Sequence, residues 1–416
     1  MFLSSGTDNV IAALEQSNRV CQVILWDLAG WQLEQVSAAM QVRFPELTHL
    51  RLLSNGKTAP IIPDSFLDGS APLLEYVELS GIPFPGLPNL VSSATHLVDL
   101  KLSDIPYSGY ISPEAIVALI SVLSSLETLL IEFQSPQSDP AHWHETRGPP
   151  PPKHFVIPAL LRFTYKGVTE YLEDLVTRID TPQLDNMQIT FFNQIDFDTP
   201  RLAQLINRTP KFGKRDATVQ FNDDFAVVTL SPGTLGIATS CREPDWQLSS
   251  TEQVCNSSLH PLSTVENLYI EHKYRQLVWK DDAIENTQWL QLLLPFTALK
   301  NLYLSKEFAL GIAAALHDLE GDRIIEVLPS LQNIFVEWLE PWGPVEETIG
   351  QFIAARRLSN HPIPISISDW DNDYGWDERS FVDDWDEDSD RDNRNEDSDE
   401  DSDRSDSDED SDRGSI

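Results

Sequence analysis

The clearest pattern along the chain is an apolar triplet at positions i, i+3 and i+5. Positions i+3 and i+5 share one face of a strand, because successive side chains of a strand alternate between its two faces. The residue at position i turns inward just before the strand begins. A weaker copy at Val20, Val23 and Leu25 precedes nine full copies, which are Leu47/Leu50/Leu52, Leu74/Val77/Leu79, Leu97/Leu100/Leu102, Leu126/Leu129/Ile131, Leu160/Phe163/Tyr165, Leu184/Met187/Ile189, Val265/Leu268/Ile270, Leu299/Leu302/Leu304 and Leu331/Ile334/Val336.

Stretches with helical periodicity separate these triplets. One contains Leu33, Val36 and Met40, and another follows Ser112 and Pro113. Serine followed by proline is a helix-start signal. One strand and one helix cannot bury an apolar face alone, whereas stacked units bury a continuous one. The pattern therefore predicts an α/β fold, built as a solenoid of irregular strand-helix repeats.

The spacing of the triplets indicates the kind of repeat. The first positions of successive triplets are separated by 23 to 34 residues, except for one interval of 81 residues. These intervals lie at or above the roughly 20–29 residues of leucine-rich repeats. Asn55 occupies the consensus Asn position after its strand, whereas other copies have apolar residues such as Ile82 and Ile105. We predict a leucine-rich-repeat-like solenoid over residues 1–368; the alternative is an ordinary α/β domain whose strands begin with leucine.

Two stretches interrupt the repeats, and two elements close them. Residues 134–154 are polar, contain four consecutive prolines, and predict an exposed loop insertion. Residues 190–260 predict tight antiparallel hairpins or degenerate repeats, because short apolar segments flank turn-forming residues. Residues 345–357 predict a closing helix. Residues 363–367 predict a last strand.

The net charge of −37 divides into two unlike parts. Residues 369–416 contain 23 acidic residues and 5 arginines, so they carry −18 and leave −19 for the other 368 residues. A segment so poor in apolar side chains cannot offset the entropy cost of ordering. We therefore predict a disordered acidic tail rich in Asp, Ser and Glu.

Composition excludes several classes of protein. The three cysteines have no zinc-type or disulfide-type spacing. No apolar run approaches the ~18 residues of a membrane span, and the first residues do not resemble a signal peptide. An acidic chain is poorly suited to nucleic acid, which needs clustered Lys and Arg. The chain is thus expected to be intracellular, cytoplasmic or nuclear, with no nucleic-acid or membrane partner.

Motifs for catalysis are missing as well. The sequence has no G-x-S-x-G, no phosphate-binding glycine loop, no H-E-x-x-H and no kinase motifs. His142 and His144 lack a third ligand, and the acidic group around Asp281 and Glu285 fits a solvated helix start. We expect no enzymatic activity, no cofactor and no metal site.

The candidate partner-binding residues flank position i+3 in the last three triplets. These strand positions face away from the buried triplet and predict the exposed concave face. An amide column beside an aromatic column results: Asn267, Asn301 and Asn333 beside Tyr269, Tyr303 and Phe335. Aromatic side chains dominate interface hot spots, so the columns favour binding of a protein. The alternative is that they only stabilise neighbouring strands.

The tail carries a second set of candidate residues. Ser389, Ser398, Ser405 and Ser407 each have an acid three residues later, the pattern of casein kinase two acceptor sites. Each phosphate would add about −1.5 to −2 charges. Aromatic residues from Trp370 to Trp385 interleave with acids, which fits either a short interaction motif or packing of Trp370 on the end of the repeats.

Parts of residues 20–370 resemble fungal, mushroom-type F-box proteins with leucine-rich-repeat-like C-terminal regions. The resemblance is most specific from 245 to 356, and the segments that carry it are 245–250, 254–259, 262–270, 289–290, 295–307 and 350–356. It implies a substrate-recruiting adaptor of a cullin-type ubiquitin ligase, in which an F-box holds a Skp1-like subunit. No Leu-Pro-x-Glu-like motif lies upstream of Val20. A Skp1-like partner is therefore expected only if an F-box precedes this sequence.

Three functional hypotheses result, of which the third is an enzyme whose site is scattered through loops. The first is a non-enzymatic interaction module that holds an unknown protein target on its concave face. The second is a protein whose acidic tail binds basic partners such as histones, because dense carboxylates attract Lys- and Arg-rich proteins.

Overall fold

The computed structural model describes residues 7–56, 59–134, 154–192, 197–212, 215–231, 235–257, 259–272, 286–319, 323–359 and 363–370. The chain divides into two units, Met1–Asp371 and Asn372–Ile416. All described residues belong to the first unit, which is a mixed α/β structure around one long sheet. The positions 134–154 and 369–416 of the predicted loop and tail lie almost wholly outside the described residues.

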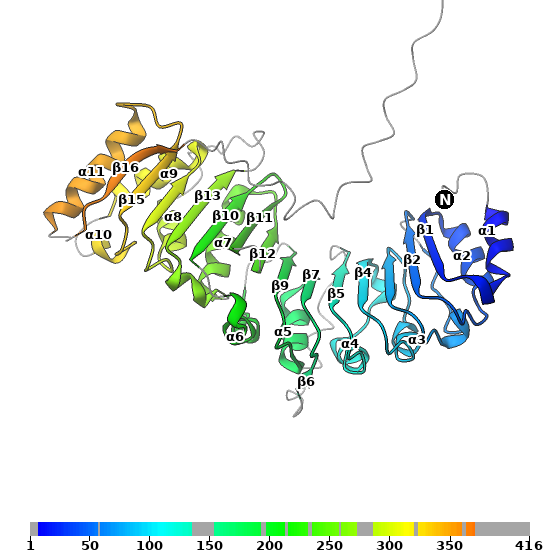
Figure 1. The fold of residues 1–416 in the computed structure, drawn as a ribbon. Coiled ribbons are helices and arrows are strands. Elements are labelled where there is room, and N and C mark those ends of the chain that lie inside the picture. Colours follow the sequence, from blue (N-terminus) through cyan, green and yellow to red (C-terminus); the bar gives the residue numbers. More distant parts are fainter. Residues whose placement is uncertain are drawn as a thin grey trace, which may run out of the picture. The chain divides into compact units, whose positions relative to one another are not determined.

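Fourteen strands of the described residues form the long sheet (Figure 1). In spatial order they are β1 (Gln22–Leu28), β2 (His49–Ser54), β3 (Tyr76–Ser80), β4 (Asp99–Ile105), β5 (Thr128–Phe133), β7 (Arg162–Gly167), β9 (Asn186–Phe191), β12 (Leu235–Ser240), β11 (Phe225–Ser231), β10 (Asp216–Phe221), β13 (Asn267–His272), β14 (Asn301–Leu304), β15 (Asn333–Glu337) and β16 (Ser366–Trp370). A separate parallel pair consists of β6 (Phe155–Val156) and β8 (Ile179–Asp180).

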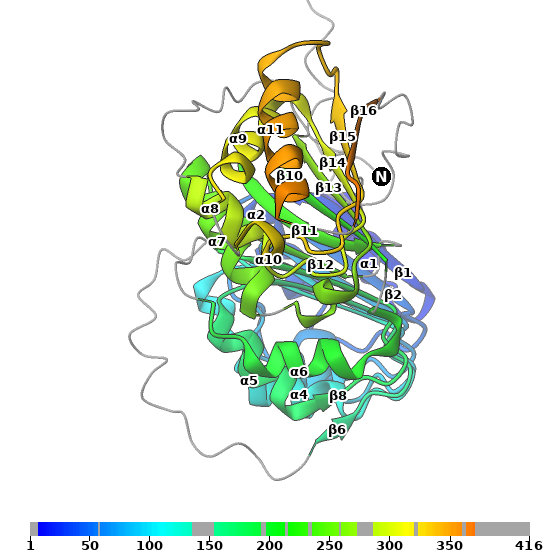
Figure 2. The same cartoon turned by 90° about the vertical axis from the view of Figure 1, so that its left-hand side faces the viewer.

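Helices connect most of the parallel strands. They are α1 (Thr7–Leu14), α2 (Gly30–Ala39), α3 (Leu87–Val91), α4 (Pro113–Ile120), α5 (Thr169–Arg178), α6 (Pro200–Arg208), α7 (Pro244–Ser257), α8 (Asn286–Leu293), α9 (Lys306–His317), α10 (Arg323–Glu326) and α11 (Pro344–Leu358). Figure 2 shows helices gathered on one side of the strands. None of the helices in the described ranges combines the length and apolar character that a membrane crossing requires.

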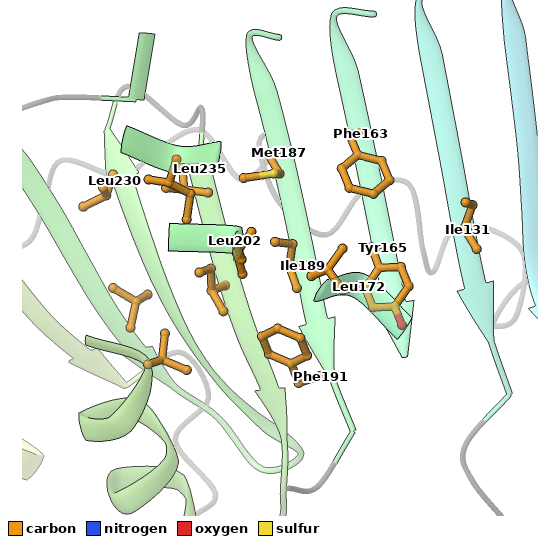
Figure 3. Packing of buried hydrophobic residues seen from close by; sticks show 14 of the residues in the cluster. Ile131, Phe163, Tyr165, Leu172, Met187, Ile189, Phe191, Leu202, Leu230 and Leu235 are labelled. Carbon is orange, nitrogen blue, oxygen red and sulfur yellow. The ribbon is translucent and has the colours of Figure 1, made fainter. Parts of the chain in front are cut away.

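The apolar triplets form the core between the sheet and these helices. All residues of the nine full triplets are buried, and none has an exposed fraction above 3%. Figure 3 shows part of this core, in which Phe163 and Met187 of the sheet belong to the same buried cluster as Leu172 of α5 and Leu202 of α6. The predicted helix start at Ser112 is also confirmed, because its hydroxyl accepts a hydrogen bond from the backbone N–H of Ala115 at 3.3 Å.

Three antiparallel strands occupy the 81-residue interval without a full triplet. β10 and β11 form one hairpin, and β11 and β12 form the next. Asn222 sets the first turn, since its side-chain oxygen accepts hydrogen bonds from the backbone N–H groups of Asp224 and Phe225. Because the chain reverses twice, β12 runs in the same direction as β10. β12 therefore pairs in parallel with β9, and β10 pairs in parallel with β13.

The end of the folded unit differs from the prediction. The last strand is Ser366–Trp370, not 363–367, because β16 pairs with β15 from Ser366 onward. Pro362 and Pro364 lack the N–H that strand pairing requires, so the alternating isoleucines of this segment indicated a start that is too early. Asp369 and Trp370, predicted to open the acidic tail, consequently belong to the sheet. The α11 helix lies just before this strand and spans the predicted closing helix.

Candidate functional site

The face of the sheet opposite the helices presents the side chains that flank each buried triplet. From β10 to β16 we call it the C-terminal open face, and strand register divides it into three rows. The first row contains Asp216, Asn267, Asn301, Asn333 and Ser366. The second contains Thr218, Tyr269, Tyr303, Phe335 and Ser368. The third contains Gln220, Glu271, Ser305, Glu337 and Trp370.

The first row is a hydrogen-bonded ladder of amides. Asn301 Nδ2 donates to Asn267 Oδ1 at 2.6 Å, and Asn333 Nδ2 donates to Asn301 Oδ1 at 2.6 Å. Asn267 Nδ2 donates to Asp216 Oδ1 at 2.5 Å, and Ser366 Oγ donates to Asn333 Oδ1 at 2.6 Å. An ionised carboxylate only accepts hydrogen bonds. Asp216 therefore determines the direction in which every amide of the ladder donates.

Replacing Asn301 by Ala tests the ladder. The change removes one donated and one accepted hydrogen bond, and water takes over the half-buried groups of Asn267 and Asn333. We expect the free energy of unfolding to fall by about 1 kcal/mol, since net hydrogen-bond contributions are modest where water can compensate. Urea denaturation measures it. No change for Asn301→Ala would show that the amide column contributes nothing to stability.

The second row is an aromatic stripe, which we define as Tyr269, Tyr303 and Phe335. The ring centroids of Tyr269 and Tyr303 are 4.3 Å apart with an interplanar angle of 12°. Those of Tyr303 and Phe335 are 4.5 Å apart at 9°. All three side chains are half-buried, so part of each ring is open to solvent. Burial, with Tyr303 beside it, raises the pKa of the Tyr269 hydroxyl to about 12, and this group stays neutral at physiological pH.

Trp370 extends the aromatic stripe from the third row. Its ring centroid lies 5.4 Å from that of Tyr303 in an edge-to-face arrangement and 6.0 Å from that of Tyr269. Sequence reasoning named packing of Trp370 on the end of the repeats as one of two alternatives. The structure places this side chain against the two tyrosines, because β16 continues through Trp370.

The N-terminal strands present a different arrangement on the same face. The guanidinium of Arg51 forms an ion pair with Glu78 at 2.9 Å and lies 5.5 Å from the ring centroid of Trp26. The ammonium of Lys101 lies 5.6 Å from the ring centroid of Tyr76. Here the chain itself supplies the cations that complement its exposed rings and carboxylates. The sequence does not reveal this cluster, because the pairing of Arg51 with Glu78 depends on the register between two strands.

The third row of the C-terminal open face carries two carboxylates around a buried hydroxyl. Ser305 directly follows Leu304, which pairs with Ile270 and Val336. Its backbone N–H donates to the Ile270 carbonyl at 3.0 Å, which continues the register and places Ser305 between Glu271 and Glu337. Burial, with the nearby Glu337 carboxylate adding to it, raises the pKa of Glu271 to about 7. Glu337 Oε2 accepts a hydrogen bond from the backbone N–H of Lys306 at 3.4 Å. The signal for this row was available in the sequence: each glutamate follows a stripe residue by two positions.

Several predicted residues lie outside the described residues. These are the candidate phosphorylation sites Ser389, Ser398, Ser405 and Ser407, together with His142, His144, Asp281, Asp282 and Glu285. Within the described ranges, no group of three His, Cys, Asp or Glu side chains is arranged to hold a metal ion. Cys255 is buried, and burial raises the pKa of its thiol well above the usual range, which disfavours a reactive thiolate.

Comparisons with known proteins find little. No family model matches the chain, and no curated protein matches it. Among solved structures, the leucine-rich repeat-containing protein LegL7 from Legionella pneumophila is similar over 80% of this chain and 97% of its own, with 11% sequence identity and a TM-score of 0.28. A TM-score of this size does not establish a common fold. The resemblance to F-box proteins receives no support from these comparisons.

Proposed function

We propose that this protein is a non-enzymatic interaction module whose long sheet is the binding framework of a leucine-rich-repeat-like solenoid. The observation that carries the proposal is the half-exposed aromatic stripe on the C-terminal open face. Its rings are held by neighbouring strands, so little side-chain entropy is lost when a partner covers them. Rigid aromatic side chains of this kind are typical anchors of protein interfaces.

A displayed random-peptide library selected on the full chain tests this proposal. Peptides retained by the full chain are expected to bind the Tyr269→Ala/Tyr303→Ala variant at least about tenfold more weakly, as for loss of a hot spot. Thermal unfolding of the variant checks that the sheet survives. Leu310→Ala, on the helix side of the molecule, is the matched control and should leave binding unchanged. Equal binding by the double tyrosine variant would exclude the stripe as the binding surface.

The resemblance to F-box proteins favours one form of this function, in which the module recruits substrates to a cullin-type ubiquitin ligase. That role requires an F-box preceding this sequence. A protein extended by such a segment should form a complex with a Skp1-like subunit in size-exclusion chromatography. Lack of a complex would remove the support for the adaptor role but not for the interaction module.

A second candidate function rests on the charge of the C-terminal residues. With 23 acidic residues in 369–416, this segment suits basic partners such as histones. Binding of purified histones should then fall steeply with added salt and disappear when the chain ends at Asp371, which keeps β16 intact. Histone binding that survives this truncation would contradict the tail hypothesis.

A further inference from the structure

The charge on the C-terminal open face differs from that on the N-terminal strands. Across β10 to β16 the three rows contain the carboxylates Asp216, Glu271 and Glu337 but no Lys or Arg. The two lysines flanking β14 already have acidic neighbours: Lys300 pairs with Glu266 at 3.1 Å, and Lys306 lies 4.0 Å from Glu307. Among the residues that the structure describes, this part of the face therefore has half-buried rings and carboxylates without the cations that the N-terminal strands provide.

The side chains of the row Glu271–Ser305–Glu337 have few hydrogen-bond partners among the described residues, and the one donor to them there is the backbone N–H of Lys306, which bonds Glu337. Among the residues that the structure describes, Glu271 has no hydrogen bond or ion pair. Ser305 is 4% exposed, and its hydroxyl, buried and without a hydrogen-bond partner in the same residues, is an uncommon feature of a folded protein. It also makes no capping bond to α9, although it occupies the N-cap position.

We propose that the row Glu271–Ser305–Glu337 is a lysine-binding site, which receives the ammonium group of a lysine from an extended peptide lying over the aromatic stripe. An ammonium group has three donors. The two carboxylates and the Ser305 hydroxyl supply three acceptors at neighbouring strand positions. The apolar stem of lysine would lie along Tyr303 and Trp370, which border this row.

Charge complementarity favours this occupant over the chain's own acidic segment. Burial, with a smaller contribution from the Glu337 carboxylate, raises the pKa of Glu271 to about 7, so a further negative charge would meet repulsion, whereas a cation would stabilise both carboxylates. The inference rests on the proposed interaction function, since it assigns the chemistry of the partner to the same surface.

The experiment uses the peptides selected from the random library on the full chain. Lysine is expected to be enriched among them. Replacing that lysine by norleucine keeps most of the apolar stem, removes the charge, and should weaken binding about tenfold or more. The Glu271→Gln/Glu337→Gln variant of the protein should bind the lysine peptide more weakly by the same factor. The norleucine peptide should bind wild type and this variant equally.

Glu75→Gln/Glu127→Gln is the matched control. It removes the same net charge from exposed positions before β3 and β5 and should leave the Kd of the lysine peptide unchanged. Equal affinity of lysine and norleucine peptides would overturn the proposal. Equal affinity for a peptide with arginine in place of lysine would also overturn it. Displacement of the lysine peptide from wild type by Ca²⁺ would overturn it too, because it would indicate a metal site. If binding depends on Tyr269 and Tyr303 but not on lysine, only the lysine site fails; if it depends on neither, the proposed function fails as well.

Discussion

Replacing Leu302 by Ala is expected to lower the free energy of unfolding by about 2–5 kcal/mol, the range for deletion of a fully buried leucine side chain. Leu302 is 0% exposed in the middle of β14 and lies in register between Leu268 and Ile334. The neighbouring strands and α9 are held by their own contacts, so the structure can close the cavity only partly. Urea denaturation measures the loss.

Leu310→Ala is the control for this prediction. Leu310 lies on α9 in the same part of the fold, but its exposed fraction is 39%. Ala has a helix propensity at least equal to that of Leu, so the substitution should cost under about 1 kcal/mol. Equal losses for Leu302→Ala and Leu310→Ala would mean that the triplet positions are not the core of the protein.

Glu132→Gln is expected to stabilise the protein at about pH 8 by on the order of 1–3 kcal/mol and to reduce the pH dependence of stability. Glu132 is only 2% exposed at the end of β5. Burial raises its pKa from 4.5 to about 8; Asp104 adds to this effect, and Lys166 opposes it only in part. The folded protein therefore favours the neutral acid, which glutamine resembles in shape.

The direction of the pH effect follows from this raised pKa. Below 4.5 the carboxyl is protonated in both folded and unfolded chains, so its contribution to stability is complete. As pH rises toward 8, ionisation favours the unfolded chain and that contribution is lost. Urea denaturation of wild type and Glu132→Gln between about pH 5 and about pH 8 should give curves that diverge with rising pH. The exposed Glu75→Gln should follow wild type, and parallel curves for Glu132→Gln would contradict the prediction.

The candidate site was only partly accessible from the sequence. Tyr269, Tyr303 and Phe335 could be named because each flanks a buried triplet position, and strand alternation then places them on one face. Their ring separations and the hydrogen bonds of the amide ladder depend on register between strands about 30 residues apart. Asp216, Ser366 and Trp370 were missed as members of the site, because β10 has no full apolar triplet and β16 begins later than its isoleucines suggest.

The burial of Glu132 and Ser305 could not be read from the sequence either. Each directly follows a buried triplet residue, so strand alternation places its side chain on the open face of the sheet, where solvent exposure would be expected. How far such a side chain is covered depends on neighbours from other strands. The raised pKa of Glu132 and the unpaired hydroxyl of Ser305 are therefore tertiary properties.

The sequence alone determined that the triplet side chains are buried, because the i, i+3, i+5 spacing matches the period of a short strand and can be recognised locally. It also indicated the mixed α/β class, since helical stretches alternate with these strands. Only the tertiary structure decided the order β9-β12-β11-β10-β13, in which three antiparallel strands enter a parallel sheet. Pairing of distant strands is chosen by the summed packing and hydrogen bonding of the whole sheet. No local pattern carries that energy.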